Sequence, residues 1–115
     1  MNNKIKVFLS QPMRGFTDEE IIARREEDIK QLKKYFKDEP FEVIDTLFKE
    51  EATAKNPAVE YLARSIAELA NADYIAMSYD FESARGCLIE HKIADEYGIE
   101  KIYLNIMKMQ LFQII

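Results

Sequence analysis

The chain has 115 residues, 48% of them hydrophobic and 32% charged, and its 21 acidic and 16 basic side chains give a net charge of −5. Plentiful apolar residues exclude a long disordered protein, and the single cysteine excludes a disulfide scaffold. No apolar run reaches the ~20 residues of a membrane span, and residues 1–6 lack the apolar stretch of a signal peptide. The sequence also has no basic cluster of the kind that binds duplex nucleic acid. We therefore expect one cytoplasmic domain over residues 1–115, with neither a membrane nor duplex nucleic acid as a partner.

Short β-rich runs alternate along the chain with longer segments of helical spacing. A capping box at Thr17 and Glu20 predicts the start of the first helix, and Gly98 predicts the end of the last one. The pattern predicts, in chain order, a strand at 5–9, a loop at 10–15, a helix at 17–36, strand 41–44, helix 58–70, strand 74–77, loop 79–83, helix 84–97 and strand 101–104. The apolar tail 105–115 is expected to be a fifth strand or an arm exchanged between subunits.

This alternation predicts an α/β fold. We expect a single flavodoxin-like or Rossmann-like domain, with a parallel sheet of four or five strands and helices on both faces. Such sheets bind ligands in the crevice beyond the carboxyl ends of their strands. The loops that matter are therefore 10–15, the segment from Asp45 onward, and 78–86.

Glu90 is the most informative candidate for chemistry. It shares a helix face with Ile93, Ala94 and Tyr97, and that face must pack on the sheet near the crevice. A carboxylate placed there is partly desolvated, which suits a nucleophile or general base at the mouth of a pocket. The alternative is that Glu90 leans out into solvent.

Two aspartates directly follow predicted strands, Asp45 after the second and Asp80 after the third. Both could point into the same crevice as Glu90, or each could simply cap a turn, which is the more favoured interpretation for Asp45. No fixed spacing among these acids supports a magnesium site, so we expect no metal.

The start of the last predicted helix, 83–87, is small and contains a glycine, so its backbone N–H groups could face an anion. Arg14 and Arg85 lie on two loops of the ligand edge and could hold a phosphate or carboxylate, or could be surface arginines in ion pairs. Cys87 and His91 are four residues apart, but nothing marks the third group that a Cys–His nucleophile needs, and two soft ligands do not make a zinc site.

These motifs together resemble the nucleoside 2-deoxyribosyltransferase-like superfamily. The resemblance rests on the strand and loop 7–15, which ends in "SQPMRG", on Asp80, and on "ARGC-x-x-EH" at 84–91, followed by Ala94, Tyr97 and Gly98. It covers nearly all of residues 5–104. It is strongest to a small branch that is frequent in phage and bacterial genomes.

The resemblance implies roles for particular residues. Glu90, four residues after Gly86, matches the glutamate that attacks the anomeric carbon, and Asp80 matches an aspartate that assists at the base. Phe8 takes the place of an aromatic residue, commonly tyrosine, that lines the site, while Ala84 stands where the family has an aspartate that holds the sugar hydroxyls. We expect the substrate-binding residues to be Phe8, Ser10, Gln11, Arg14, Gly15, Asp45, Ser83, Arg85 and Gly86.

The implied activity is cleavage of the N-glycosidic bond, or base exchange, on a (deoxy)nucleoside or nucleotide, without a cofactor. Water as acceptor gives hydrolysis and a second base gives transfer, and a phosphate held by Arg14 or Arg85 would make the substrate a nucleotide. The resemblance also implies a homodimer or larger homo-oligomer. Because Ala84 departs from the pattern, a non-catalytic nucleotide-binding module is the alternative, and an oligomeric interaction protein with a vestigial site is a third.

Overall fold

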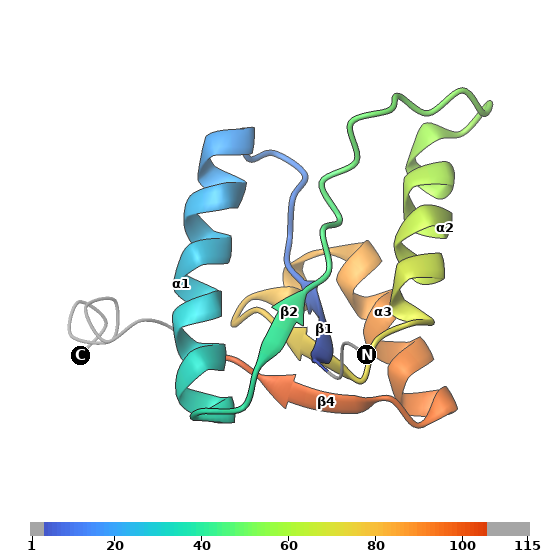
Figure 1. Cartoon of the computed structure of the whole chain (residues 1–115). Coiled ribbons are helices and arrows are strands. Elements are labelled where there is room, and N and C mark those ends of the chain that lie inside the picture. Colours follow the sequence, from blue (N-terminus) through green and yellow to red (C-terminus); the bar gives the residue numbers. More distant parts are fainter. Residues whose placement is uncertain (1–3, 106–115) are drawn as a thin grey trace.

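The computed structural model describes residues 4–105, which form a four-stranded parallel sheet between helices (Figure 1). This confirms the predicted α/β fold of the flavodoxin or Rossmann kind. The elements in chain order are β1 (Ile5–Ser10), α1 (Asp18–Phe36), β2 (Phe41–Val43), α2 (Pro57–Leu69), β3 (Tyr74–Met77), a 3₁₀ turn η1 (Phe81–Ser83), α3 (Arg85–Tyr97) and β4 (Glu100–Tyr103). The prediction for the tail falls, apart from Asn105, outside the described residues.

The strand order β2-β1-β3-β4 places the first strand inside the sheet. From β1 the chain passes through α1 to β2 on one side, then returns through α2 to β3 on the other side of β1. Figure 1 shows the result, with α1 over one face of the sheet and α2 and α3 over the opposite face. The carboxyl ends of β1 and β3 therefore form the topological switch point, where this kind of sheet binds ligands.

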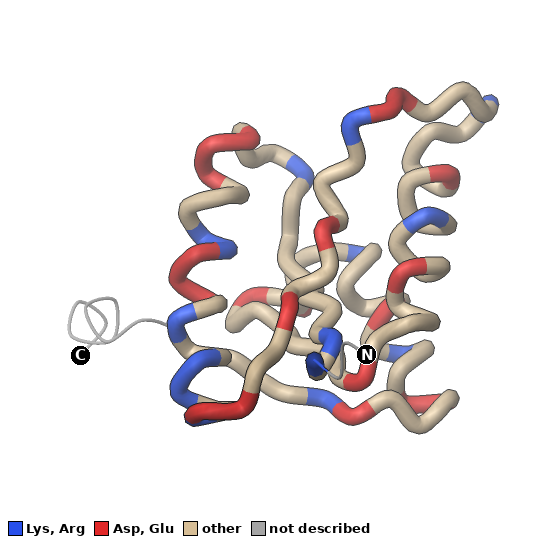
Figure 2. Tube along the Cα trace, in the orientation of Figure 1, with Lys and Arg blue, Asp and Glu red and all other residues tan. Residues whose placement is uncertain are grey.

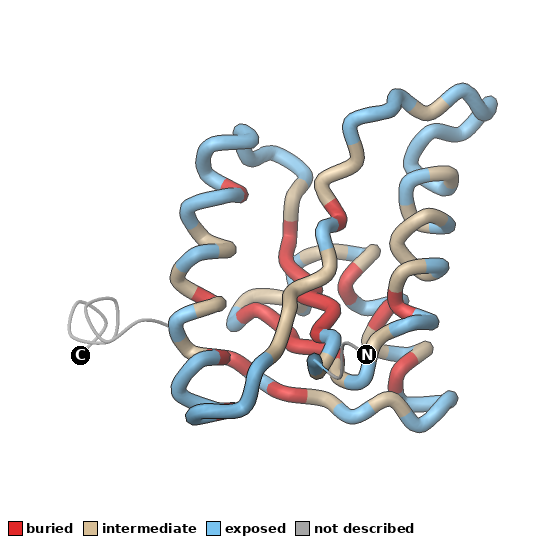
Figure 3. The backbone as a smooth tube through the Cα atoms, in the orientation of Figure 1, coloured by how far each residue is buried: buried red, intermediate tan, exposed pale blue. Residues whose placement is uncertain are grey.

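Two apolar cores lie on the two faces, because successive strand residues point to opposite sides. Val7 and Leu9 of β1 pack with Leu32 and other residues of α1. Phe8, between them in sequence, packs on the other face with Leu69 of α2 and with α3. Figure 3 shows this buried backbone concentrated in the central strands.

Helix α1 begins where local chemistry predicts. Thr17 accepts a hydrogen bond from the Glu20 N–H, and the Glu20 carboxylate accepts one from the Thr17 N–H, which confirms the capping box. The first turn is acidic and the last turn carries Lys33 and Lys34, as the helix dipole favours (Figure 2). Figure 2 also shows acidic and basic residues interspersed along the described chain.

The remaining elements follow the predicted order with small shifts at their ends. Gly98 ends α3 in the left-handed region at φ 72°, as predicted. The loop expected at 79–83 contains the 3₁₀ turn, whose first hydrogen bond runs from the Ser83 N–H to the Asp80 carbonyl. Among the described residues, no helix combines the length and apolarity needed to cross a membrane.

Candidate functional site

A cavity of about 650 Å³ lies on the α2 and α3 face, at the carboxyl ends of β1 and β2. Its walls are the segment after β1, the segment after β2, the first half of α2, and the start of α3. In a parallel sheet the following helices begin at the edge where the strands end, so all four walls meet at the carboxyl edge of the sheet, next to the switch point. The volume lies within the usual range for small-molecule sites.

The carboxylate of Glu90 borders this cavity from inside the fold. Glu90 lies between Cys87 and Ala94 on the buried face of α3, and it is only 7% exposed. Its Oε1 accepts a hydrogen bond of 2.7 Å from the Oγ of Ser10, at the end of β1. Burial raises the pKa of the Glu90 carboxyl to about 7, although the hydrogen bond from Ser10 acts in the opposite direction.

Cys87 also lines the cavity, but its thiol is not activated. Burial raises the pKa of the Cys87 thiol to about 11, so it is protonated near neutral pH. His91 lies elsewhere: its ring stacks on Phe81 and its Nε2 is 2.7 Å from the hydroxyl of Tyr103. The structure therefore does not bring Cys87 and His91 together as a nucleophile pair.

Most of the expected substrate-binding residues meet at the cavity. Ser10 reaches it through its hydrogen bond to Glu90. Gly15 lies in the adjoining loop at φ 89°, a conformation that favours glycine. Those that line the cavity directly are Phe8, Gln11, Arg14, Ser83, Arg85 and Gly86.

Asp45 and Asp80 are not among the residues that line the cavity. The side chain of Asp45 is 75% exposed, accepts a hydrogen bond from the Leu47 N–H and lies 3.8 Å from Arg25, so it caps a turn. Asp80 forms a 2.5 Å ion pair with Arg24 of α1. Their predicted roles in substrate binding and catalysis stay predictions.

Sequence reasoning missed an aromatic part of the wall. Phe16 from the segment after β1, Phe48 from the segment after β2, and Tyr61 from α2 all line the cavity. The available signal was positional: the start of α2 must lie at the ligand edge, because helices run antiparallel to the strands of such a sheet.

The segment between β2 and α2 is held by polar contacts from Glu60, Tyr61 and Arg64 of α2. The guanidinium of Arg64 donates to the carbonyls of Glu50 and Glu51, and it also pairs with Glu60. It lies over the rings of Tyr61 and Phe48, at 5.2 and 6.0 Å from their centroids. This wall of the cavity is therefore held by packing and polar contacts together.

A second buried carboxylate lies on the opposite face of the sheet. Asp28 of α1 accepts a 2.6 Å hydrogen bond from the Oγ of Ser78, and burial raises the pKa of its carboxyl. It continues the buried stripe of Ile21, Leu32 and Phe36, and that spacing was the signal that could have found it. Unlike Glu90, it does not line the cavity.

Within residues 4–105, no group of three or more histidine, cysteine or acidic side chains could hold a metal ion. A family model described as a domain of unknown function (DUF4406) matches residues 5–103, a stretch that contains every residue lining the cavity. Searches of curated proteins and of solved structures give no match.

Proposed function

The chain belongs to the DUF4406 family, and we propose that it cleaves the N-glycosidic bond of a deoxynucleoside or deoxynucleotide, with Glu90 as the nucleophile. The observation that carries this proposal is the Glu90 carboxylate, buried yet bordering a cavity of small-molecule size and held by Ser10. The motif resemblance to the nucleoside 2-deoxyribosyltransferase-like superfamily adds support, since Gly86 and Glu90 have the spacing of its catalytic helix.

The proposed reaction has two steps. A carboxylate oxygen of Glu90 attacks the anomeric carbon while the C–N bond breaks, and the bonding electrons leave with the base nitrogen, which takes a proton from water. A second water then attacks the same carbon, gives up a proton to the hydroxide left by the first step, releases the glutamate as a carboxylate and yields the free sugar. A second base in place of water gives base exchange. This is the double displacement of retaining glycosidases.

The environment of Glu90 suits this role. With a pKa of about 7, a large fraction of the side chain is ionised at neutral pH, and that carboxylate is poorly solvated. A poorly solvated anion beside the sugar stabilises the positive charge that develops on the anomeric carbon. The Oε1 atom of Glu90 accepts the hydrogen bond from Ser10. This bond orients the carboxylate, and the other oxygen, Oε2, is the one proposed to attack.

Two arginines favour a nucleotide over a nucleoside. Arg14, in the segment after β1, and Arg85, at the start of α3, both line the cavity and both are exposed. Neither guanidinium has an ion-pair partner among the described residues. Arginine is well suited to bind phosphate, so we propose a 5′-monophosphate as the preferred substrate.

A nucleotide-binding module without catalysis is the second candidate. Ala84 lines the cavity at the position where the related transferases carry the aspartate that holds the sugar hydroxyls. Alanine cannot hydrogen-bond the sugar hydroxyls, so one contact to the sugar is missing. The neighbouring Ser83 is the polar side chain that could replace it. Binding would persist in that case while turnover would not.

A substrate panel separates the two candidates. The protein is incubated with deoxynucleosides, ribonucleosides and their 5′-monophosphates, free base is measured by chromatography, and Glu90→Gln and Glu90→Ala serve as matched controls. Base release that both variants abolish supports the enzyme, with monophosphates the best substrates. Thermal stabilisation by nucleotides without release supports the binding module. No release and no stabilisation with any compound contradicts both, and unchanged release by Glu90→Ala contradicts the role of Glu90.

The implied homo-oligomer is part of this proposal and follows from the resemblance alone. Light scattering after size exclusion gives the mass in solution and tests it directly.

A further inference from the structure

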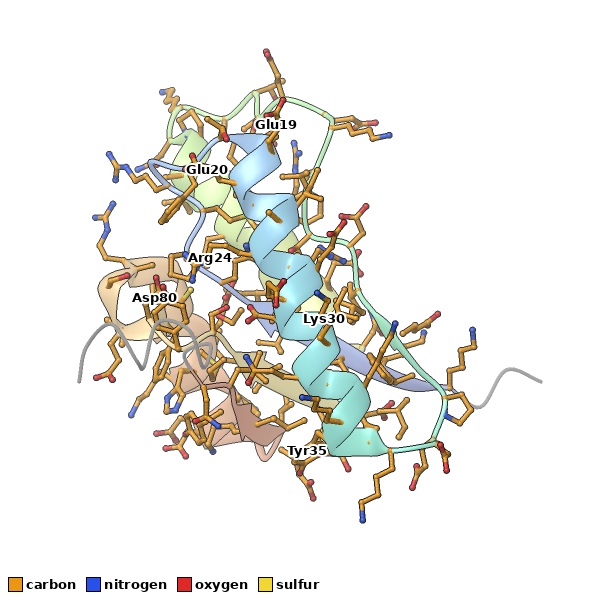
Figure 4. The ribbon with its side chains drawn as sticks, turned by 90° about the vertical axis from the view of Figure 1, so that its left-hand side faces the viewer. Glu19, Glu20, Arg24, Lys30, Tyr35 and Asp80 are labelled. Atoms are coloured by element: carbon orange, nitrogen blue, oxygen red, sulfur yellow. The ribbon has the colours of Figure 1, made fainter. Side chains whose placement is uncertain are left out.

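One guanidinium joins three segments beside the cavity. Arg24 of α1 lies 5.1 Å from the ring centroid of Phe16, in the segment after β1, and 5.2 Å from that of Tyr79, after β3. Its Nη2 also donates to Oδ1 of Asp80 at 2.5 Å. Figure 4 shows the Arg24 side chain leaving α1 toward Asp80. We call this arrangement of Arg24, Asp80, Phe16 and Tyr79 the Arg24 clamp.

The clamp is more than a surface ion pair. The side chains of Arg24 and Asp80 are only 19% and 26% exposed. Burial opposes the charge on Arg24, yet the hydrogen bond and charge of Asp80 raise its pKa above the ordinary value. Removal of Asp80 would therefore leave a partly buried cation without its counter-ion, which costs more than losing an exposed pair.

The clamp reaches the cavity through Phe16. The ring of Phe16 lines the cavity, whereas Asp80 and Arg24 do not. Phe16 closes a tight turn, since its N–H donates to the Met13 carbonyl at 3.1 Å. The turn includes Arg14, which we propose as a phosphate ligand, so the position of Phe16 also fixes the loop that carries that arginine.

We propose that Arg24 and Asp80 are positioning residues, which hold the Phe16 wall and the loop 13–16 in the binding conformation, and that Asp80 does not contact the substrate. This differs from the base-assisting role that the motif resemblance implies for Asp80. The kinetic part of the inference rests on the proposed function, but the structural part does not.

Fluorescence tests the structural part without any substrate. The chain has no tryptophan, so Phe16→Trp places a single reporter in the clamp. In that background we expect Asp80→Asn and Arg24→Met each to shift the emission to longer wavelength and increase quenching by acrylamide, while Asp80→Glu restores much of the original signal. Glu60→Gln is the matched control, because Glu60 pairs with Arg64 on the other wall. Emission unchanged by both Asp80→Asn and Arg24→Met overturns the clamp, even if no substrate is ever turned over.

Kinetics then separate positioning from catalysis. We expect Asp80→Asn and Arg24→Met each to raise KM about tenfold, the size of one lost favourable contact, with kcat nearly unchanged. The double variant should be no worse than either single one, because both remove the same unit. A large loss of kcat in Asp80→Asn, absent in Arg24→Met, would assign Asp80 to the chemistry and overturn the inference. Far-UV circular dichroism checks that each variant folds, and Phe16→Leu repeats the KM measurement should Arg24→Met fail to fold.

Discussion

The two faces of the sheet carry the same pair of groups with different surroundings. On one face Ser10 donates to Glu90 at 2.7 Å, and on the other Ser78 donates to Asp28 at 2.6 Å. The two serines are neighbours at the ends of β1 and β3, where the Ser78 N–H donates to the Ser10 carbonyl. The two carboxylates therefore lie on opposite faces of the sheet, next to the switch point, and burial raises the pKa of both.

Access to a cavity distinguishes the two pairs. Glu90 borders the cavity, whereas Asp28 lies on the buried face of α1 and does not line it. Asp28 also lies within the field of Arg24, which opposes the effect of its burial, whereas the pKa of Glu90 is set, among residues 4–105, by burial and the hydrogen bond from Ser10. A buried carboxylate with a raised pKa is thus not enough to propose catalysis, because structural networks also produce it.

The largest expected effect is on activity. Glu90→Gln keeps the size of the side chain but removes the nucleophile, so base release should fall at least about a thousandfold. Asp28→Asn removes a comparably buried carboxyl group and should leave the rate within about tenfold. Steady-state assays on the best substrate of the panel measure both. An equal loss in the two variants would mean that the comparison reports stability of the fold and not access to substrate.

The next effect is on stability as a function of pH. A carboxyl whose pKa is raised on folding stabilises the protein fully below its ordinary pKa of 4.5, and that contribution is lost as the pH rises through about 7. The wild type should therefore lose about 2–3 kcal/mol of unfolding free energy between pH 5 and pH 8 through this group. Glu90→Gln should not show this loss. Urea denaturation at the two pH values measures it, and parallel curves for the two proteins would contradict a raised pKa at Glu90.

The same measurement extends the comparison to Asp28. Because burial also raises its pKa, Asp28→Asn should change the pH dependence in the same direction. The double variant should combine the two effects, provided that the carboxylates do not sense each other across the sheet.

The smallest expected effect is on the pH profile of the reaction. A nucleophilic carboxylate must be ionised, so the rate should fall as the pH decreases through about 7. Ser10→Ala removes the hydrogen bond that favours the ionised form of Glu90. The acidic limb of the pH–rate profile should therefore move to higher pH by about one unit. Ser78→Ala is the matched control and should leave the limb in place. A limb that moves in both variants would show that the two pairs are coupled.

Most of the fold could be predicted because its signals are local. The capping box at Thr17, the glycine stop at Gly98 and the alternation of strands and helices depend on neighbouring residues only. The burial of Glu90 was one of two open interpretations, and the structure confirms it. Ala94, which shares its helix face, is buried too, but Tyr97, which was expected on the same packed face, is 81% exposed, because α3 leaves the sheet surface at its last turn before Gly98.

The partners of the acidic residues could not be predicted in the same way. Asp80 pairs with Arg24, 56 positions earlier in the chain, and that contact depends on how α1 is rotated over the sheet. The burial of Asp28, by contrast, could have been predicted, because Asp28 lies on the apolar stripe of α1 that ends at Phe36. The position of Phe48 in the cavity wall could not be predicted, because it depends on the course of the segment between β2 and α2, and that segment has no periodic sequence pattern.

The most direct test of the central claim is to find the sugar on the protein. The reaction with the best deoxynucleotide is quenched in acid within the first turnovers, and the digested protein is mapped by mass spectrometry. The proposed mechanism predicts a deoxyribosyl ester on the peptide that contains Glu90, absent from Glu90→Gln and present in Asp28→Asn. A sugar attached to another residue, or base release that persists undiminished in Glu90→Gln, would contradict it.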